Sequence, residues 1–430
     1  MKQTRPFPQL VVTRKAVRSI SAGHPWVFES EVLRLAPAPT DGCEAQNGDI
    51  VDVIEENGTW QGAALLSHKS VIRARIVSRN ANDSFDEDFW RRRIFWAWQH
   101  RMTTLGAHSR PGQEDDTTCC RVLFSEADGV PGLTIDKYED VLVAQVGTVG
   151  MERLRSIIYP IVLDVLDSSG YTITAIYERN DGGVRAKEGL PLYKGWWNTT
   201  SSKGAKILVR ENGLRFELDL ENSQKTGFFL DQKYNRRAVS ALARGRRVLD
   251  CFCHVGPFGL GAIQGGASYA RLVDASQTAL DLARANAGLN GFSVTGNEAQ
   301  VGFTRADALE YLPSLRNKAT LRAEGGPFDL IILDPPAFAK TRTSVRHATK
   351  GYRDINASAM RILPRGGYLA TCSCSHYMTT DLLRQALADA AHIANRQLKQ
   401  VEERQQAPDH PILWGFPQSH YLDFFIFQVI

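Results

Sequence analysis

Residues 247–258, RVLDCFCHVGPF, indicate an apolar β-strand that runs into a glycine-containing turn and then into an apolar helix. The same alternation continues along the C-terminal half, where helical stretches separate further apolar runs. The predicted strands are VLDCF (248–252), ARLVDA (270–275), DLIILD (329–334) and YLATCS (368–373). Alternation of this kind is typical of a doubly wound α/β sheet. We therefore predict a Rossmann-like α/β domain over residues 206–430.

Four successive strand units of this half end in an acidic residue. In doubly wound folds ligands bind beyond the carboxyl ends of the strands, so the four acids are expected to face one crevice. A single such acid is ordinary turn chemistry, but four in order predict a nucleoside cofactor. We expect Asp274 to accept the ribose hydroxyls, and Asp307 with the backbone N–H of Ala308 to hold an adenine edge. The four acids are Asp250, Asp274, Asp307 and Asp334.

The turn after the first of these strands distinguishes between cofactors. A dinucleotide site requires Gly-x-Gly-x-x-Gly, which leaves a helix N-terminus open to a pyrophosphate. Here the turn leading through Gly256 to Phe258 has too few glycines, and it begins with Asp250. A carboxylate repels pyrophosphate and attracts a cation. S-adenosylmethionine carries an ammonium and a sulfonium, so it is predicted in place of NAD, with Gly256 and Phe258 among the residues that bind it.

Two basic runs without any acid stand out, although the net charge of +4 is too small to argue for nucleic-acid binding by itself. Such runs suit the neutralisation of RNA phosphates, although a solvated helix face gives the same pattern. The first run lies between Lys233 and Arg247, and the second between Lys340 and Arg353. The residues predicted to contact RNA are Lys233, Arg236, Arg237, Lys340, Arg342, Arg346 and Lys350.

The N-terminal half has a different pattern and predicts two smaller domains. Residues 1–80 are β-rich, with strands at QLVVT (9–13), DIVDVIE (49–55) and VIRARIV (71–77), and with a hairpin turn at Asn57-Gly58. Residues 84–205 alternate strands and helices, beginning with a helix at 84–102 and a loop at 106–118, and predict a central α+β domain. KILVRENGLRFELDL (206–220) predicts a further strand pair that turns at Asn212-Gly213.

The composition is that of a soluble globular protein, with 43% hydrophobic and 23% charged residues. No apolar run is long enough to cross a membrane and no signal peptide is recognised, so we expect a cytoplasmic protein. None of the seven cysteines forms a Cys-x-x-Cys pair, and no metal site is predicted.

These motifs together resemble the bacterial 23S rRNA cytosine-5 methyltransferase family, whose members are class I S-adenosylmethionine-dependent enzymes with an N-terminal PUA domain. The resemblance covers nearly the whole chain. It rests on GHPWVF (23–28), DGVPGLTID (128–136), ERND (178–181), ENG (211–213), QKTGFFLDQ (224–232), the Asp250 strand, DPPAF (334–338) and TCSCS (371–375).

The resemblance implies a PUA domain at residues 1–80 that binds RNA, and methylation of cytosine C5 in the rRNA of the large ribosomal subunit. It leaves open which cytosine is modified and whether the chain forms a homodimer. Within QKTGFFLDQ, it favours cofactor contacts by Lys225, Thr226, Phe228 and Asp231. Pro257 departs from the family, whose members tend to have Gly or Ser there, and it removes one N–H from the cofactor turn.

Carbon methylation requires a nucleophile, because cytosine C5 is unreactive until a thiolate adds to C6. Cytosine-5 methyltransferases of other RNA families place this cysteine in a Thr-Cys-Ser segment, which predicts Cys372 as the nucleophile and leaves Cys374 as the rival. Asp334 is predicted to protonate or hydrogen-bond the cytosine ring, and with Pro335 to lie against the cofactor. Two buried thiols without a role would give the same sequence.

Two other functions remain open at this point. An exocyclic N-methyltransferase acting on guanine or adenine also uses Asp-Pro-Pro, but with an aromatic residue directly after the prolines, where this chain has Ala337. A non-catalytic RNA-binding factor of ribosome assembly would have no physical reason to keep the cofactor acids.

Overall fold

The computed structural model describes residues 5–105, 116–198, 204–222, 226–296, 298–339, 341–375 and 377–430. The chain divides into two compact units. The first unit comprises Met1–Ile207, Leu218–Leu230 and Pro408–Ser419, and the second comprises Leu208–Glu217, Asp231–Ala407 and His420–Ile430. None of the helices in the described part of the chain is long and apolar enough to span a membrane.

The first unit begins with a six-stranded sheet in the order β2-β6-β5-β4-β1-β3. The three strands predicted for residues 1–80 and the Asn57-Gly58 hairpin, which joins β4 and β5 antiparallel, are confirmed. The elements of this part are β1 (Gln9–Val12), α1 (Arg14–Ser21), β2 (Trp26–Phe28), η1 (Glu29–Glu31), β3 (Val32–Ala36), β4 (Ile50–Glu55), β5 (Trp60–Leu66) and β6 (Ile72–Ser78).

A second, five-stranded sheet in the order β11-β10-β9-β8-β7 follows, packed against two long helices. The predicted helix at 84–102 is confirmed as α2, and residues 106–115 of the predicted loop lie outside the described residues. The elements are α2 (Glu87–Leu105), β7 (Cys119–Phe124), η3 (Ser125–Asp128), β8 (Leu133–Tyr138), β9 (Val141–Val146), α3 (Val149–Asp167), β10 (Ala175–Asn180), α4 (Gly183–Lys187) and β11 (Tyr193–Trp197).

A close backbone approach explains one glycine of the GHPWVF motif. Gly23 has a φ of +104°, and a Cβ added there would lie 2.7 Å from Cα of Gly415, in the Pro408–Ser419 segment of the same unit. Beside this contact, the rings of Phe416 and Trp26 pack with their centroids 4.7 Å apart. The glycine therefore allows a distant segment to dock on the N-terminal sheet.

We expect Gly23→Ala to destabilise the protein by about 1–3 kcal/mol, because the new methyl group meets backbone that has no flexible side chain to move. Thermal unfolding should show a clear fall in Tm. Gly58→Ala is the matched control, since Gly58 also has a positive φ, of +82°, but no atom lies within 4 Å of an added Cβ. If both variants unfolded at the same temperature, the fall would come from backbone strain and not from the contact with Gly415.

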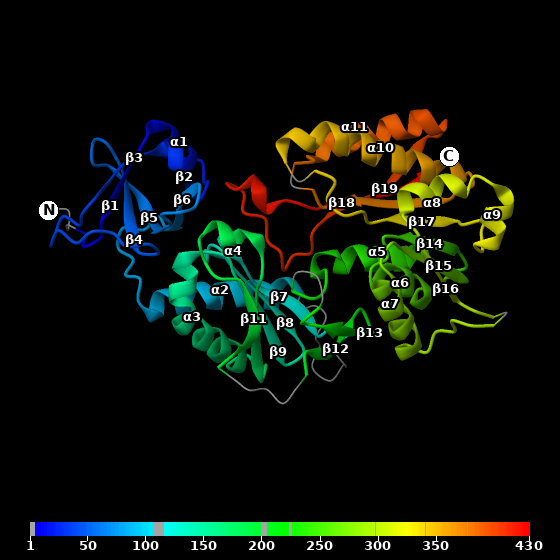
Figure 1. The fold of residues 1–430 in the computed structure, drawn as a ribbon, viewed down its shortest axis with the longest axis horizontal. Helices are drawn as coiled ribbons and strands as arrows, with labels where there is room; N and C mark the ends of the chain where they lie inside the picture. The colour runs from blue at the N-terminus through cyan, green and yellow to red at the C-terminus, as the bar shows by residue number, and fades with distance from the viewer. Residues whose placement is uncertain are drawn as a thin grey trace. The chain divides into compact units, whose positions relative to one another are not determined.

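The second unit contains the predicted doubly wound sheet, with seven strands in the order β16-β15-β14-β17-β18-β20-β19 (Figure 1). The four predicted strands are confirmed as β14, β15, β17 and β18, which run parallel, whereas β20 is antiparallel to β18 and to β19. The strands are β14 (Arg247–Cys251), β15 (Tyr269–Asp274), β16 (Val301–Arg305), β17 (Leu330–Leu333), β18 (Tyr368–Ser373), β19 (Leu398–Gln405) and β20 (Asp423–Val429).

Helices cover both faces of this sheet. Helices α5, α6 and α7 lie on one side, and α8, α10 and α11 on the other (Figure 1). Their bounds are α5 (Lys233–Leu242), α6 (Pro257–Gln264), α7 (Gln277–Leu289), α8 (Ala308–Ser314), α9 (Lys318–Ala323), α10 (Val345–Ile362) and α11 (Thr380–Ala394). Short 3-10 turns η4 (Leu230–Gln232), η5 (Arg342–Ser344) and η6 (Pro417–Ser419) and the predicted hairpin β12 (Lys206–Glu211) and β13 (Leu214–Asp219) complete the fold.

The strand order reverses between β14 and β17, since the chain proceeds to β15 and β16 on one side and to β18 on the other. The connections that follow these two strands therefore diverge onto opposite faces, and the carboxyl ends at such a reversal are where doubly wound folds bind ligands.

Candidate active site

The functional side chains of the second unit gather at the carboxyl edge of the parallel strands. Asp250 lies near the end of β14 and Asp274 ends β15, while Asp334 and Cys374 directly follow β17 and β18. Because the carboxyl ends of parallel strands meet at one edge of a sheet, these residues lie along the same edge, near the strand-order reversal.

Asp334 is the centre of a polar cluster. Its Oδ1 accepts hydrogen bonds from Cys372 Sγ at 2.8 Å and from Gln232 Nε2 at 3.1 Å. The same Gln232 amide lies 3.3 Å from Cys372 Sγ. Removal from water raises the pKa of Asp334, against the lowering effect of these donors and of Arg236. A perturbed pKa of this kind is common at functional sites.

The two candidate thiols differ in exposure. Cys372 belongs to β18, which is paired on both sides, and its side chain is fully buried. Burial, with Asp334 beside it, raises the pKa of this thiol well above its usual value. Cys374 follows the strand, is half-buried, and its Sγ lies 3.7 Å from the carbonyl oxygen of Pro335. Cys374 is therefore the more exposed of the two thiols, whereas the sequence predicted Cys372 as the nucleophile.

The loop after β14 is strained and shaped around Asp250. Phe252 and His254 have positive φ angles of 62° and 50°, in the left-handed region that side chains other than glycine seldom adopt. Gly256, at φ +89°, begins α6, and the N–H of Gly259 in its first turn donates to Asp250 Oδ2 at 2.8 Å. Strain of this kind commonly marks a ligand site.

The second carboxylate oxygen of Asp250, Oδ1, is buried and has no hydrogen-bond partner among the residues that the structure describes. Burial raises the pKa of this carboxyl to about 8, with further raising effects from Asp334 and Asp274. A buried acid that lacks a partner is the arrangement that a cationic ligand would complete.

The other predicted cofactor acids also hold local structure. Asp274 accepts the N–H groups of His254 at 3.0 Å and Ser276 at 2.8 Å, and so fixes the loop after β14. Asp307 is exposed and caps α8, where it accepts the N–H of Leu309 at 2.9 Å, directly before the buried Ala308. Asp274 ends β15 and Asp307 follows β16, and each also forms the turn that the simpler interpretation requires.

The structure corrects the prediction that Phe258 contacts the cofactor with its side chain. Its ring is buried, stacks on Phe424 at 5.9 Å, and lies under the Arg236 guanidinium. The side chain therefore belongs to the core. Any contact that Phe258 makes with a ligand must come from its backbone at the start of α6.

The QKTGFFLDQ block is divided between the two units. Thr226 and Phe228 are buried in the first unit, where Tyr138 Oη accepts the Phe228 N–H at 3.2 Å. Asp231 belongs to the second unit and accepts the Tyr421 hydroxyl at 2.7 Å, and Lys225 lies outside the described residues. Gln232 contacts both Asp334 and Cys372, but the sequence analysis did not predict it as a site residue. Its position at the end of the QKTGFFLDQ block is the sequence feature that indicates it.

Two of the predicted RNA-binding residues are wrongly placed for that role. Lys233 and Arg236 are buried, and Arg236 forms an ion pair with Glu211 at 2.7 Å, so neither presents its charge to a phosphate. Arg237 is half-buried and donates to Asn212 at 3.1 Å.

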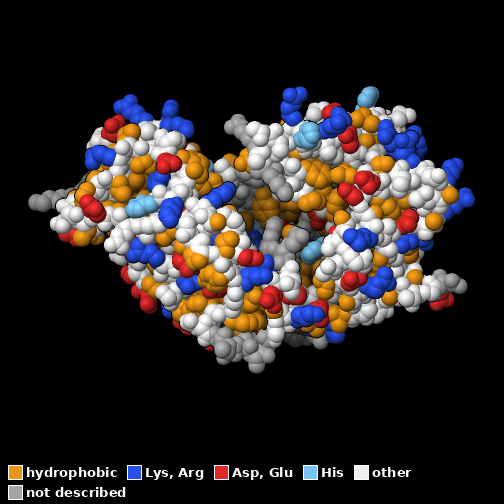
Figure 2. Space-filling model, in the orientation of Figure 1, with side chains coloured by type: hydrophobic (Ala, Val, Ile, Leu, Met, Phe, Trp, Pro, Cys, Tyr) orange, Lys and Arg blue, Asp and Glu red, His pale blue; other side chains and the backbone are white. Residues whose placement is uncertain are grey.

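The second basic run has a more open position. Arg346 and Lys350 are exposed on α10, and basic side chains lie over the α10–α11 part of the second unit in Figure 2. Lys340 and the side chain of Arg342 lie outside the described residues. Within the described ranges, no cluster of three or more metal-ligating side chains occurs.

Comparison with known proteins agrees with this arrangement. The S-adenosylmethionine-dependent methyltransferase family matches residues 196–415, and a PUA-like domain matches residues 10–79. The chain is 38% identical to ribosomal RNA large subunit methyltransferase I of Shewanella denitrificans, over 94% of this chain and 95% of that protein. It is 37% identical to the protein of the same name from Erwinia tasmaniensis, over 98% and 99%.

A solved structure shares the fold as a whole. The SAM-dependent methyltransferase from Streptococcus mutans has a TM-score of 0.77 at 20% identity, over 98% of this chain and 99% of that one. The predicted fold class, with a PUA-like domain followed by a Rossmann-like methyltransferase domain, is confirmed, as is S-adenosylmethionine as the cofactor.

Proposed function

Since the chain belongs to the S-adenosylmethionine-dependent methyltransferase family that includes ribosomal RNA large subunit methyltransferase I, we propose that it methylates C5 of a cytosine in 23S rRNA. The observation that carries the choice of C5 is the half-buried Cys374 at the end of β18, beside the loop that holds Asp334. A thiol next to a carboxyl group of raised pKa is the pair that activation of a pyrimidine ring needs. Methylation of an exocyclic amine needs no thiol.

The cofactor residues follow from charge. Asp250 is suited to bind the ammonium group, because its buried Oδ1 has no partner among the described residues. Asp274 and the Asp307–Ala308 turn are suited to the ribose and the adenine, beyond β15 and β16. When bound, S-adenosylmethionine supplies an electrophilic methyl group on its sulfonium.

The protein's own residues activate the base. The Cys374 thiolate, having released its proton to solvent, adds to C6 of the cytosine while the Asp334 carboxyl donates a proton to N3. C5 then has enamine character and would take the methyl group as the methyl–sulfonium bond breaks, which would leave S-adenosylhomocysteine. Loss of the C5 proton to a base, with return of the N3 proton to Asp334, breaks the C6–S bond and frees Cys374.

Cys372 and Gln232 act as positioning residues for Asp334. Both donate hydrogen bonds to its Oδ1, from opposite parts of the chain. They fix the direction in which the carboxyl group faces the ring and leave its other oxygen available.

Release of tritium tests this function. With rRNA labelled at C5 of cytosine with tritium, methylation at C5 must release tritium to water in the same amount as methyl groups are incorporated. Incorporation without release would instead show an exocyclic N-methyltransferase. The absence of incorporation on naked rRNA and on assembling subunits would favour an assembly factor without catalysis.

Asp250→Asn is expected to weaken binding of S-adenosylhomocysteine and, at the same time, to stabilise the ligand-free protein. Burial raises the pKa of Asp250 from 3.8 to about 8, so in this range folding requires protonation of the carboxyl group. The contribution of Asp250 to stability is complete below 3.8 and is lost as the pH rises towards 8. Asparagine removes this loss, which is on the order of 1 kcal/mol per pH unit.

Calorimetric titration and thermal unfolding across this pH range check both effects. The gain in Tm of the variant over the wild type should increase with pH. A difference in Tm that did not vary with pH would contradict the role given to Asp250.

A further inference from the structure

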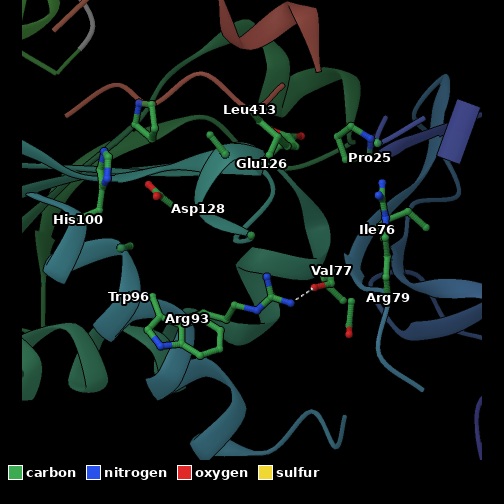
Figure 3. A pocket seen from close by; sticks show the side chains of 16 residues that line it. Pro25, Ile76, Val77, Arg79, Arg93, Trp96, His100, Glu126, Asp128 and Leu413 are labelled. Atoms are coloured by element: carbon green, nitrogen blue, oxygen red, sulfur yellow. Dashed lines mark hydrogen bonds between the residues drawn. The ribbon is translucent and has the colours of Figure 1, made fainter. Parts of the chain in front are cut away.

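A pocket of about 510 Å³ lies within the first unit, and its lining includes none of the acids and thiols described above. Its walls come from the end of β6, one face of α2, η3, and the Pro408–Ser419 segment. Trp96 and His100 lie on one side of the view in Figure 3, and Arg79 and Pro25 on the other. The volume falls in the range of small-ligand sites and suits a single nucleotide.

Two arginines of this pocket lack an acidic partner. Within the described ranges, neither Arg79 nor Arg93 has a carboxylate at ion-pair distance, and Arg93 donates only to the carbonyl oxygen of Val77, at 2.6 Å. Desolvation lowers the pKa of both guanidinium groups. By contrast, the buried Arg75 and Arg101 in the same unit are ion-paired.

Each acidic side chain of the pocket lies beside an arginine, although the arginine beside Glu126, Arg75, also pairs with Glu188. Asp128 forms a two-pronged pair with Arg101, with both N···O distances at 2.7 Å. Glu126 accepts the indole N–H of Trp26 at 2.8 Å and lies 3.7 Å from the Arg75 guanidinium. Among the described residues, Arg79 and Arg93 are therefore lining cations without a carboxylate at ion-pair distance, since Asp83 acts on Arg93 only from further away, and the pocket favours an anion.

Trp96 adds a flat apolar surface to the positive charge. Its side chain is 56% exposed although it lines the pocket, and it follows Arg93 by one helical turn on α2. Bases of single-stranded nucleic acids stack on such rings without regard to sequence. An anion site beside an exposed indole matches the two halves of a nucleotide.

We propose that this pocket binds one nucleotide of a single-stranded RNA segment, with the phosphate at Arg79 and Arg93 and the base against Trp96. The identification of that RNA as the rRNA substrate rests on the proposed function. The pocket then contributes to binding of the substrate and not to the chemical step.

The test is the salt dependence of RNA binding by the full chain, measured by fluorescence anisotropy with a labelled single-stranded RNA. We expect Arg79→Gln and Arg93→Gln each to weaken binding roughly tenfold and to lower the slope of log K against log salt by about 0.7. Trp96→Ala should weaken binding roughly 5- to 150-fold and leave that slope unchanged.

Neighbouring residues provide matched controls. Arg92→Gln and Phe95→Ala remove an exposed charge and an exposed ring from α2 at positions that do not line the pocket, and both should bind RNA as the wild type does. Arg79 is exposed, so its variant keeps the test valid even if the Arg93 or Trp96 variant folds poorly.

Each outcome decides between the proposals. Pocket variants that bind RNA as the wild type does would overturn the proposed role of the pocket, and the proposed methylation of cytosine would be unaffected by that result. If the pocket variants lost RNA binding and the wild type methylated no cytosine, the pocket would be supported and the proposed function refuted. Competition by inorganic phosphate as strong as that by RNA would reduce the pocket to an anion site and overturn the nucleotide assignment.

Discussion

Cys374→Ala is expected to lower the rate of methyl transfer by at least about 10⁴-fold, whereas Cys372→Ala should lower it by no more than about tenfold. The first variant removes the atom that we propose bonds to C6, and loss of a covalent nucleophile costs this much or more. The second removes one hydrogen bond to Asp334, at 2.8 Å, whose loss costs on the order of 1 kcal/mol. Methyl incorporation into rRNA with each variant measures the difference.

Trapping of the covalent complex separates chemistry from folding. RNA containing 5-fluorocytidine cannot lose its C5 substituent as a cation, so the C6–S bond should persist and give a denaturation-resistant adduct. We expect this adduct with the wild type and with Cys372→Ala, and its absence with Cys374→Ala. An adduct that required Cys372 would restore the order predicted from the sequence and would mean that β18 opens during the reaction.

Asp334→Asn is expected to reduce kcat by about 10²- to 10⁴-fold without weakening the binding of S-adenosylhomocysteine. Asparagine retains the polar contact with Gln232 but cannot give a proton to N3. Because burial raises the pKa of Asp334, the proton remains available at a higher pH than on a free aspartic acid. The activity of the wild type should therefore fall as the pH rises through the raised pKa of Asp334. The residual activity of the variant should show no such fall.

Asp329→Asn provides the matched control. Asp329 directly precedes β17, whereas Asp334 directly follows it, and both side chains are half-buried. The Asp329 carboxylate accepts a hydrogen bond from the N–H of Arg247 at 3.0 Å. It stands at the opposite end of the same strand, away from the crevice, so its variant should retain kcat. Equal losses in both variants would show that Asp334 acts only through stability.

The sequence predicted four of the five parallel strands correctly, because strands buried on both faces are continuous apolar runs bounded by turn residues, but not β16, in which only Val301 is buried. It missed β19, LKQVEERQ, because this edge strand is largely exposed and polar and has no apolar run to reveal it. The sequence also led to the wrong prediction that Lys233 and Arg236 are exposed to RNA. A basic run does not show which of its charges will meet a distant acid such as Glu211.

The choice between the two thiols lay beyond the sequence for a geometric reason. Residues two apart in a strand point to the same side, so Cys372 and Cys374 share one pattern. What separates them is where β18 ends, at Ser373, which leaves one thiol inside the paired ladder and the other beyond it. The acids after the strands could be predicted because one edge of a parallel sheet brings them together whatever the details of packing.

The position of the new methyl group on the base tests the central claim most directly. 23S rRNA would be incubated with the protein and with S-adenosylmethionine carrying a deuterated methyl group, then digested to nucleosides and analysed by mass spectrometry. We predict that the label appears in 5-methylcytidine, and that it disappears with Cys374→Ala. Label in an N-methylated guanosine or adenosine would contradict carbon methylation.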